Sequence, residues 1–215
     1  MKLEGAIFDV DGTLLDSMVI WDTIGGNYLR SRGITPKPGL DARFRSMSLY
    51  QAVRHYQDEY GLTDSADALM AGVNAMIEDY YAHQVQPKAG VPAFLESLHK
   101  RGVRMCLATA TDHHLVEAAL TRTGLWGYFG GVFTCSGVGH GKDEPHIFHT
   151  ALHFLGTPKA ATCVFEDALY AVRTAKQAGF TVAAVQDPFE HDGDTVQKLA
   201  DYYITHFHET EGLFT

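Results

Sequence analysis

The stretch FDVDGTLLD, residues 8–16, decides the interpretation of this chain. It begins at the end of an apolar run, residues 5–8, which has the length and composition of a buried strand. Asp9 and Asp11 therefore follow a strand end directly, where open α/β sheets bind their ligands. Two carboxylates so close together repel each other unless a cation lies between them. The stretch predicts a site with bound magnesium, although Asp-Gly is also a common turn signal and could simply open a turn.

Apolar runs of strand length alternate with helix-like segments over most of the chain. The expected strands are residues 5–8, 103–108, 132–135, 162–165, 181–185 and 202–204. The expected helices between them are residues 92–100, 113–121, 144–154 and 168–177. This alternation favours a parallel sheet covered by helices on both faces. The sequence therefore predicts an α/β fold with a doubly wound parallel sheet.

The interval between residues 17 and 83 breaks this alternation. It carries no convincing strand and three helix-like stretches, which are separated by residues 33–39 and 61–64. We interpret it as an inserted, all-helical module. The expected division is a core made of residues 1–16 and 86–215, with the helical module at residues 17–85.

Composition limits the classes of function. The 215 residues suffice for a core domain with a modest second module, and 46% hydrophobic with 20% charged residues is typical of a globular protein. The formal charge of −9 and the lack of a basic run argue against a nucleic-acid partner. No hydrophobic segment has the length of a signal peptide core or a membrane span. We expect a cytoplasmic protein without a membrane partner, either a monomer or a homodimer.

Three further stretches place polar groups beside predicted strand ends. Thr109, followed by the amide of Ala110, could hold a small anion, although a strand-end Thr is more often structural. Lys142 lies in a glycine-bracketed loop before a helix, where an ammonium can balance carboxylate and phosphoryl charge or simply be solvated. Glu166 and Asp167 end the fourth predicted strand and offer further oxygen ligands, or serve only the helix dipole.

These four stretches, in this order and spacing, resemble the four motifs of the haloacid dehalogenase (HAD) superfamily. The match covers nearly the whole chain, and residues 87–101 resemble the family's approach to the second motif. The position of the insert is similar to the four-helix cap of the family's first cap subclass, as in the subfamily of β-phosphoglucomutase and related phosphatases. Asp143 and His146 stand where the family pattern GKPxPDIF has Pro and Asp, and Ala168 and Ala171 replace the Ser and Gly of EDSxxG. Neither departure removes a group that the chemistry uses.

The resemblance implies a magnesium-dependent phosphatase that acts on a small phosphorylated metabolite, such as a sugar phosphate. Asp9 would attack phosphorus and form an aspartyl-phosphate, and the Asp11 side chain would act as general acid and then base. The Asp9 carboxylate, the Asp11 backbone carbonyl and the Asp167 carboxylate would hold magnesium. Glu166 would bind the metal directly or through water.

The same resemblance assigns substrate contacts. Thr109 and the Ala110 amide would hold phosphoryl oxygens, while Lys142 would neutralise the charge that they share with the nucleophile. The cap residues expected to face the substrate are Trp21, Arg45 and Ser48. Core packing for Trp21 and solvent exposure for Arg45 are the structural alternatives.

Three other functions compete with a phosphatase. Mutases of the β-phosphoglucomutase type carry a His where Trp21 stands and an Arg where Leu49 stands, so the hydrolase is favoured. Dehalogenases of the family lack a carboxylate at the position of Asp11. A non-catalytic binding protein of the same fold would be expected to have lost one of the catalytic or metal-binding residues, and all are present.

The histidines raise the question of a second metal site. His146, His149 and His153 share a helical face, and His206 and His208 alternate further along the chain. No carboxylate partner is evident beside either set, and the acidic strand ends already account for a metal. We therefore expect no transition-metal site.

Overall fold

The computed structural model describes the chain except Met1, Arg45, Ser46, Ser48, Glu211 and Thr215, and describes Ala42 by its backbone alone. The chain divides into two compact units. The sheet unit is formed by Met1–Asp16 and Val85–Thr215, and the helical unit by Ser17–Gln84. Val85 thus falls in the sheet unit, whereas the sequence analysis placed it at the end of the helical module.

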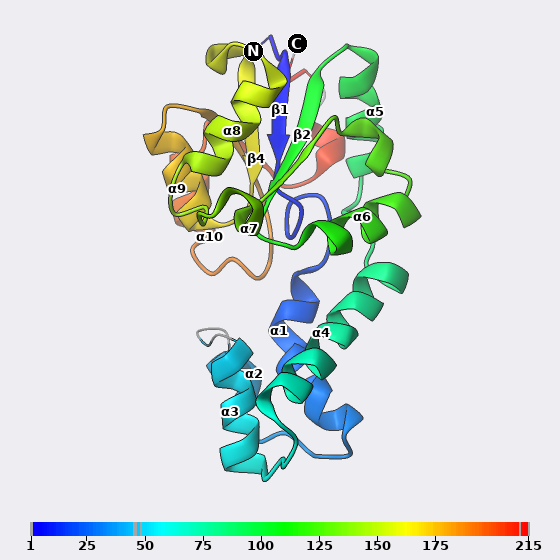
Figure 1. Ribbon diagram of the computed structural model, residues 1–215. Helices are drawn as coiled ribbons and strands as arrows, with labels where there is room; N and C mark the ends of the chain where they lie inside the picture. Colours follow the sequence, from blue (N-terminus) through cyan, green and yellow to red (C-terminus); the bar gives the residue numbers. More distant parts are fainter. Residues whose placement is uncertain (1, 45–46, 48, 211, 215) are drawn as a thin grey trace. The chain divides into compact units, whose positions relative to one another are not determined.

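The sheet unit is built on a six-stranded parallel sheet with the strand order β3-β2-β1-β4-β5-β6 (Figure 1). The strands are β1 (Gly5–Phe8), β2 (Arg104–Thr109), β3 (Val132–Thr134), β4 (Thr162–Glu166), β5 (Thr181–Val185) and β6 (Tyr202–Ile204). The predicted doubly wound α/β fold is confirmed. The strand order reverses beside β1, where ligands of such folds bind outside the carboxyl ends of the strands.

Alternation along the strands explains why both faces of the sheet are covered. Ile7 and Val164 belong to a buried cluster with apolar residues of α8, α9 and α10. Their neighbours Phe8 and Phe165 face the other way and stack with ring centroids 4.3 Å apart. Phe94 of α5 packs edge-on against both rings. Every residue of β1 and β4 is buried, and the sequence of both strands is apolar except for Thr162 and Glu166 at the two ends of β4.

Helices and short 3-10 turns connect the strands of the sheet unit. They are α5 (Val91–Lys100), α6 (His113–Arg122), η1 (Trp126–Tyr128), α7 (Cys135–Val138), α8 (His146–Leu155), η2 (Lys159–Ala161), α9 (Leu169–Gln177), α10 (Gly193–Leu199) and η3 (Phe207–Glu209). Helix α8 begins two residues later than predicted, because Pro145 occupies the N-cap position. Its fixed φ suits the start of a helix and not its interior. The residues between α7 and Pro145 therefore form a loop, and this loop carries Lys142.

The helical unit contains α1 (Met18–Ser31), α2 (Leu40–Phe44), α3 (Leu49–Tyr60) and α4 (Ala66–His83). The second predicted helical stretch is divided into α2 and α3. Gly25 lets α2 approach α1, because a Cβ at Gly25 would lie 2.5 Å from the ring of Phe44. The hydroxyl of the buried Tyr56 donates to the Gly25 carbonyl at 2.9 Å. Within the described residues, no helix is both long enough and apolar enough to span a membrane.

Candidate active site

The loop that follows β1 fixes the position of Asp9. The Asp9 amide donates to the carbonyl of Phe165 at 2.9 Å and so extends the pairing of β1 with β4. The chain then turns back on itself, since Leu15 donates to the Val10 carbonyl at 2.8 Å and Gly12 to the Leu15 carbonyl at 3.0 Å. Gly12 has φ 78, which glycine adopts without strain. The turn thus holds Asp9 at the carboxyl edge of the sheet.

Three buried carboxylates meet at this edge. Asp9 follows β1 and Glu166 ends β4, and these strands are neighbours in parallel register. With Asp167 they bring carboxylate oxygens within 4.8 Å of one another, and all three residues are buried. Three negative charges in so small a buried volume repel one another strongly. The group therefore has the composition of a site for a hard divalent cation.

Lys142 provides positive charge to this cluster. Its ammonium donates to the Asp9 carboxylate and, at 2.6 Å, to Oε1 of Glu166, and its side chain is only 3% exposed. Burial alone lowers the pKa of Lys142, but Asp9 and Glu166 outweigh that effect and raise it above its usual value. One ammonium against three carboxylates leaves an excess of two negative charges when all are ionised. A divalent cation would match that excess.

The acid–base properties of the carboxylates show the same deficit of positive charge. Burial raises the pKa of Asp9 to about 8, with further contributions from Glu166 and Asp11 that Lys142 only partly opposes. The pKa of Asp167 is also raised well above its usual value, chiefly by burial and then by the charges of Glu166 and Asp9. A bound cation favours the charged form of a carboxylate and would reverse both shifts. The three oxygen donors therefore fit a magnesium ion.

Two threonine hydroxyls orient the acidic side chains, and sequence reasoning assigned neither of them a role. Thr13 donates to Oδ1 of Asp167 at 2.8 Å, and both groups are buried. Thr111 donates to Oδ2 of Asp11 at 2.5 Å. Thr13 lies in the opening motif, but no local pattern shows that it contacts a residue 154 positions away.

Glu166 is engaged through both of its oxygens. Oε1 accepts from Lys142, and Oε2 accepts from the amides of Asp167 at 3.0 Å and Ala168 at 3.1 Å. This arrangement suits a residue that positions Lys142. Each carboxylate oxygen has a second lone pair, so Glu166 can keep these bonds and still ligate a metal ion directly.

The other predicted residues of the sheet unit lie on the neighbouring strand or loop. Thr109 is the last residue of β2, is fully buried, and accepts from the Thr111 amide at 3.1 Å. Ala110 follows it at an exposed position. Asp11 is half-buried, and its carboxylate is not one of the three clustered carboxylates. The metal ligand predicted for Asp11 is its backbone carbonyl, whereas its side chain accepts the hydrogen bond from Thr111.

The helical unit carries the predicted substrate-selecting residues. Trp21 is 40% exposed, and its indole N–H donates to the Tyr81 hydroxyl at 3.2 Å. Arg45 and Ser48 lie outside the described residues.

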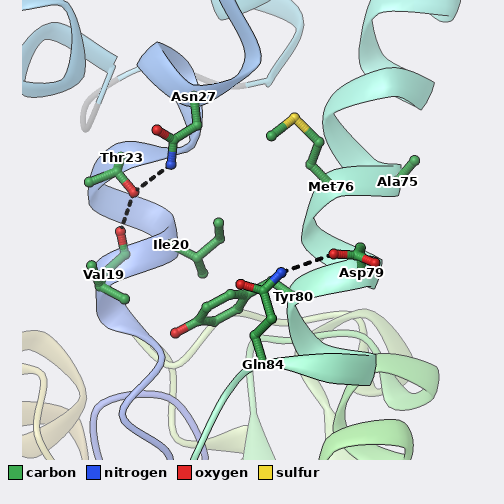
Figure 2. Close-up of a pocket in the computed structure, with 9 residues that line it drawn as sticks. All are labelled: Val19, Ile20, Thr23, Asn27, Ala75, Met76, Asp79, Tyr80 and Gln84. Carbon is green, nitrogen blue, oxygen red and sulfur yellow. Dashed lines mark hydrogen bonds between the residues drawn. The ribbon is translucent and has the colours of Figure 1, made fainter. Parts of the chain in front are cut away.

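Helices α1 and α4 also form a hollow of about 470 Å³, which sequence reasoning did not find (Figure 2). It is lined by Val19, Ile20, Thr23, Asn27, Ala75, Met76, Asp79, Tyr80 and Gln84. Asn27 donates to Thr23 at 3.2 Å on one side, and Gln84 donates to Asp79 at 3.0 Å on the other. The lining therefore combines apolar side chains with amide, hydroxyl and carboxylate groups. No motif marks it, because its lining comes from two helices far apart in the sequence.

Comparison with known proteins places this site in a family. The sequence model of the haloacid dehalogenase-like hydrolases matches residues 3–179. The chain belongs to this family of hydrolases, as its motifs indicated.

Individual relatives are distant but align over most of their length. Hexitol phosphatase A of Escherichia coli (strain K12) is 28% identical over 192 residues, which cover 87% of this chain and 85% of the relative. The phosphorylated carbohydrates phosphatase of Thermotoga maritima is 25% identical over 177 residues, 82% of each chain. The crystal structure of CbbY from Rhodobacter sphaeroides in complex with phosphate superposes with a TM-score of 0.77 at 19% identity, over 98% of this chain and 97% of that chain. This last similarity shows a common fold.

Proposed function

We propose that the protein is a magnesium-dependent phosphatase that hydrolyses a small phosphorylated metabolite through an aspartyl-phosphate on Asp9. The observation that carries the proposal is the buried cluster of three carboxylates with Lys142. Relatives named as phosphatases of hexitols and of phosphorylated carbohydrates support a sugar phosphate or polyol phosphate as substrate.

The proposed metal site consists of the Asp9 carboxylate, the Asp11 backbone carbonyl and the Asp167 carboxylate. Magnesium, when bound, screens the negative charge of the phosphoryl oxygens and keeps Asp9 ionised. Thr13 positions Asp167 for this role through its hydrogen bond of 2.8 Å. Glu166 orients Lys142 through Oε1, and we propose that it also contacts the metal, directly or through water.

The reaction has two steps. In the first, an Asp9 oxygen attacks phosphorus in line, the bond between phosphorus and the leaving oxygen breaks, and Asp11 donates its proton to that oxygen. In the second, Asp11 takes a proton from a water molecule, which attacks the aspartyl-phosphate and releases inorganic phosphate. Asp9 is thereby restored. The hydrogen bond from Thr111 holds the Asp11 carboxylate in one orientation for both transfers.

Phosphoryl binding is assigned to Thr109, the amide of Ala110 and Lys142. The ammonium of Lys142 lies against Asp9, where it can balance the charge of the nucleophile and the transferred group. The Thr109 hydroxyl is fully buried and accepts a hydrogen bond from the Thr111 amide. Contact with a substrate therefore requires this hydroxyl to become accessible from the site. Trp21 and Arg45 are proposed to take part in substrate selection.

The direct test is hydrolysis of p-nitrophenyl phosphate with magnesium and with EDTA. Asp9→Asn keeps the size of the side chain but removes its nucleophilicity, so kcat is expected to fall by roughly 10⁴-fold or more. In the parent, borohydride reduction during turnover should convert the aspartyl-phosphate into homoserine, detected by mass spectrometry at residue 9. Equal rates for parent and Asp9→Asn would reject Asp9 as nucleophile, and a non-catalytic protein would show no turnover in either.

Mutase activity is the second function to separate. Trp21 stands where a mutase uses histidine, and its indole N–H is held by Tyr81, so it offers no acid–base group. We therefore expect phosphate from a sugar bisphosphate to be released to water. Transfer to an added sugar monophosphate, with little free phosphate, would identify a mutase instead.

A further inference from the structure

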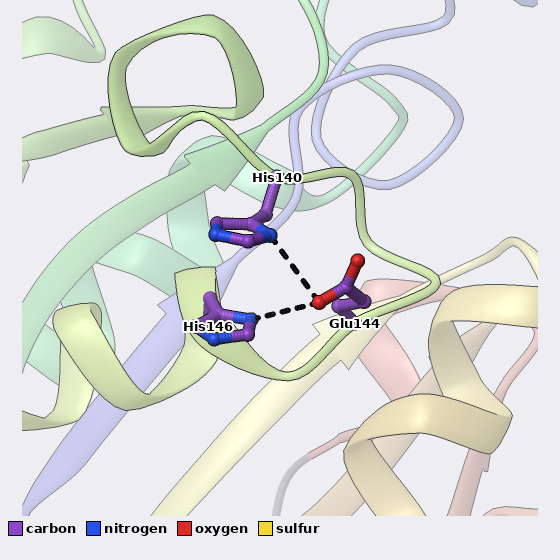
Figure 3. A group of neighbouring side chains, drawn as sticks. All are labelled: His140, Glu144 and His146. Carbon is purple, nitrogen blue, oxygen red and sulfur yellow. Dashed lines mark ion pairs between the residues drawn. The ribbon is translucent and has the colours of Figure 1, made fainter.

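Two imidazoles and one carboxylate meet on the loop that carries Lys142 (Figure 3). Nδ1 of His140 lies 3.2 Å from Oε2 of Glu144, and Nδ1 of His146 lies 3.3 Å from the same oxygen. All three potential ligand atoms lie within 4.8 Å of one another. The expectation that no carboxylate stands beside His146 is wrong, because the loop before Pro145 folds Glu144 back toward the first residue of α8.

The distances in this cluster match the spacing of metal ligands. Zinc binds histidine nitrogen and carboxylate oxygen at about 2.0 to 2.1 Å, so neighbouring ligand atoms of a tetrahedral site lie about 3.3 to 3.4 Å apart. The two distances of 3.2 and 3.3 Å to Glu144 agree with that value. Two histidines and one glutamate also form a known three-ligand zinc set with an open fourth position. We propose that His140, Glu144 and His146 bind a divalent transition-metal ion, for which Zn²⁺ is the probe.

Binding requires only a small rearrangement of exposed side chains. The His140 and His146 rings are stacked with centroids 3.9 Å apart and an interplanar angle of 11°. Parallel rings cannot both aim Nδ1 at one ion, so at least one ring must rotate. The three side chains are 41%, 52% and 53% exposed in chain order, so solvent borders each of them.

The backbone already holds the three ligands close together. Gly139 adopts φ 76, and the Glu144 amide donates to the Gly141 carbonyl at 3.3 Å in a turn. His146 is fixed as the first residue of α8. The ligands therefore need little further ordering of the chain when they bind an ion.

The same loop points a different group into the protein. Lys142 lies between His140 and Glu144 in sequence, but it is buried against Asp9 and Glu166. An ion bound by residues on both sides of Lys142 would restrict the loop that supplies this ammonium. The outer site would thus act as a brace for the loop of the inner site.

The two clusters should select different metals. In the described part of the chain, the other group of three potential ligands this close is the buried set of Asp9, Glu166 and Asp167. Carboxylates alone suit magnesium, whereas imidazoles favour zinc and other transition metals. His113 and Glu117 form an exposed pair at 3.6 Å, which lacks the second imidazole.

Isothermal titration with ZnCl₂ in excess MgCl₂ tests the proposal on the full chain. The parent should bind a zinc ion. The double variant His140→Ala/His146→Ala should not bind it, or should bind it at least about tenfold more weakly, because losing only a hydrogen-bond partner of a metal ligand already has an effect of that size. His153→Ala, an exposed histidine on the same helix, should leave binding unchanged. Equal stoichiometry and affinity in parent and double variant would overturn the proposal.

Two further measurements exclude other origins of the signal. Asp167→Asn weakens the buried carboxylate cluster, so its retention of the zinc ion supports the outer site and its loss would assign the zinc to the inner one. Hydrogen–deuterium exchange of residues 139–146 should slow on zinc addition in the parent but not in the double variant. Unchanged exchange in the zinc-loaded parent would contradict coordination by three ligands of one loop. Neither measurement depends on turnover.

Discussion

The loop between α7 and α8 contributes to two clusters that differ both in burial and in the kind of side chain that they contain. On one side, Lys142 is enclosed with three buried carboxylates; on the other, His140, Glu144 and His146 are exposed. Inside the protein, charges are poorly screened, so each group depends on its partners and shifts their pKa values. At the surface, water can replace a missing partner. Burial therefore makes each group of the inner cluster depend on its charged partners, whereas the groups of the outer cluster depend on theirs much less.

The comparison is tested most strongly by removing the buried ammonium. Lys142→Met leaves three buried carboxylates without their cation, and we expect the free energy of unfolding in EDTA at pH 8 to fall by about 3 to 5 kcal/mol. Urea denaturation measures this change. Lys100→Met is the control, because Lys100 forms an exposed pair with Glu96 at 3.0 Å and its loss should have little effect. Similar losses in both variants would contradict the role assigned to burial.

Burial of Asp9 should also make the stability of the protein depend on pH. In the metal-free protein, folded Asp9 keeps its proton up to about pH 8, whereas in the unfolded chain it loses the proton near pH 4. Between these values the folded state binds more protons, so stability should fall as pH rises from about 4 to about 8. Urea midpoints across this range should show the parent losing stability relative to Asp9→Asn. Magnesium should reduce the loss, and parallel profiles would show that Asp9 is ionised without metal.

The hydroxyl that orients Asp167 should affect metal affinity. Thr13→Val keeps the shape of the side chain but removes the donor, and we expect magnesium to bind about 10- to 100-fold more weakly. Thr13→Ser keeps the donor and should bind nearly as tightly as the parent. Calorimetry of magnesium binding separates the two. Equal affinities for Val and Ser would mean that the hydrogen bond to Asp167 does not matter for the metal.

The smallest expected effect concerns the hydroxyl beside Asp11. Thr111→Val removes the donor to the Asp11 carboxylate, and a bond of about 1.4 kcal/mol corresponds to an approximately tenfold lower kcat. Because Thr111 acts through Asp11, magnesium affinity should stay unchanged, and Thr111→Ser should restore kcat. A kcat that is equal in the Val and Ser variants would remove Thr111 from the mechanism.

Strand positions could be predicted almost to the residue. The expected strand at residues 103–108 is β2 (Arg104–Thr109), and that at 181–185 coincides with β5. Apart from Arg104, Thr109 and Thr181, these segments are apolar because they are buried on both faces of the sheet, and an apolar run is a local property of the sequence. The helix expected from residue 144 begins at His146, with Pro145 at its N-cap position. The prediction started too early because proline favours the start of a helix over its interior.

Contacts between distant segments could not be predicted in the same way. The hydrogen bond from Thr13 to Asp167 joins two strand ends and depends on their register. The hollow between α1 and α4 requires two helices to pack. The group of His140, Glu144 and His146 is local in sequence, yet it was missed, because His146 was grouped with His149 and His153 of the same helix and not with the loop residues that precede it. A periodic sequence pattern predicts a helix or a strand. In a turn, the position of each side chain depends on the backbone angles of the individual residues.

The central position of β1 has a consequence for biosynthesis. β1 is translated before both of its partner strands: Gly5 pairs with Arg104 of β2 and with Thr162 of β4. The helical unit, Ser17–Gln84, draws its internal contacts from one continuous interval and has no such delay. The nascent chain therefore carries an apolar strand with both edges unpaired until β2 and β4 have been translated. Such a strand is a natural target for chaperones.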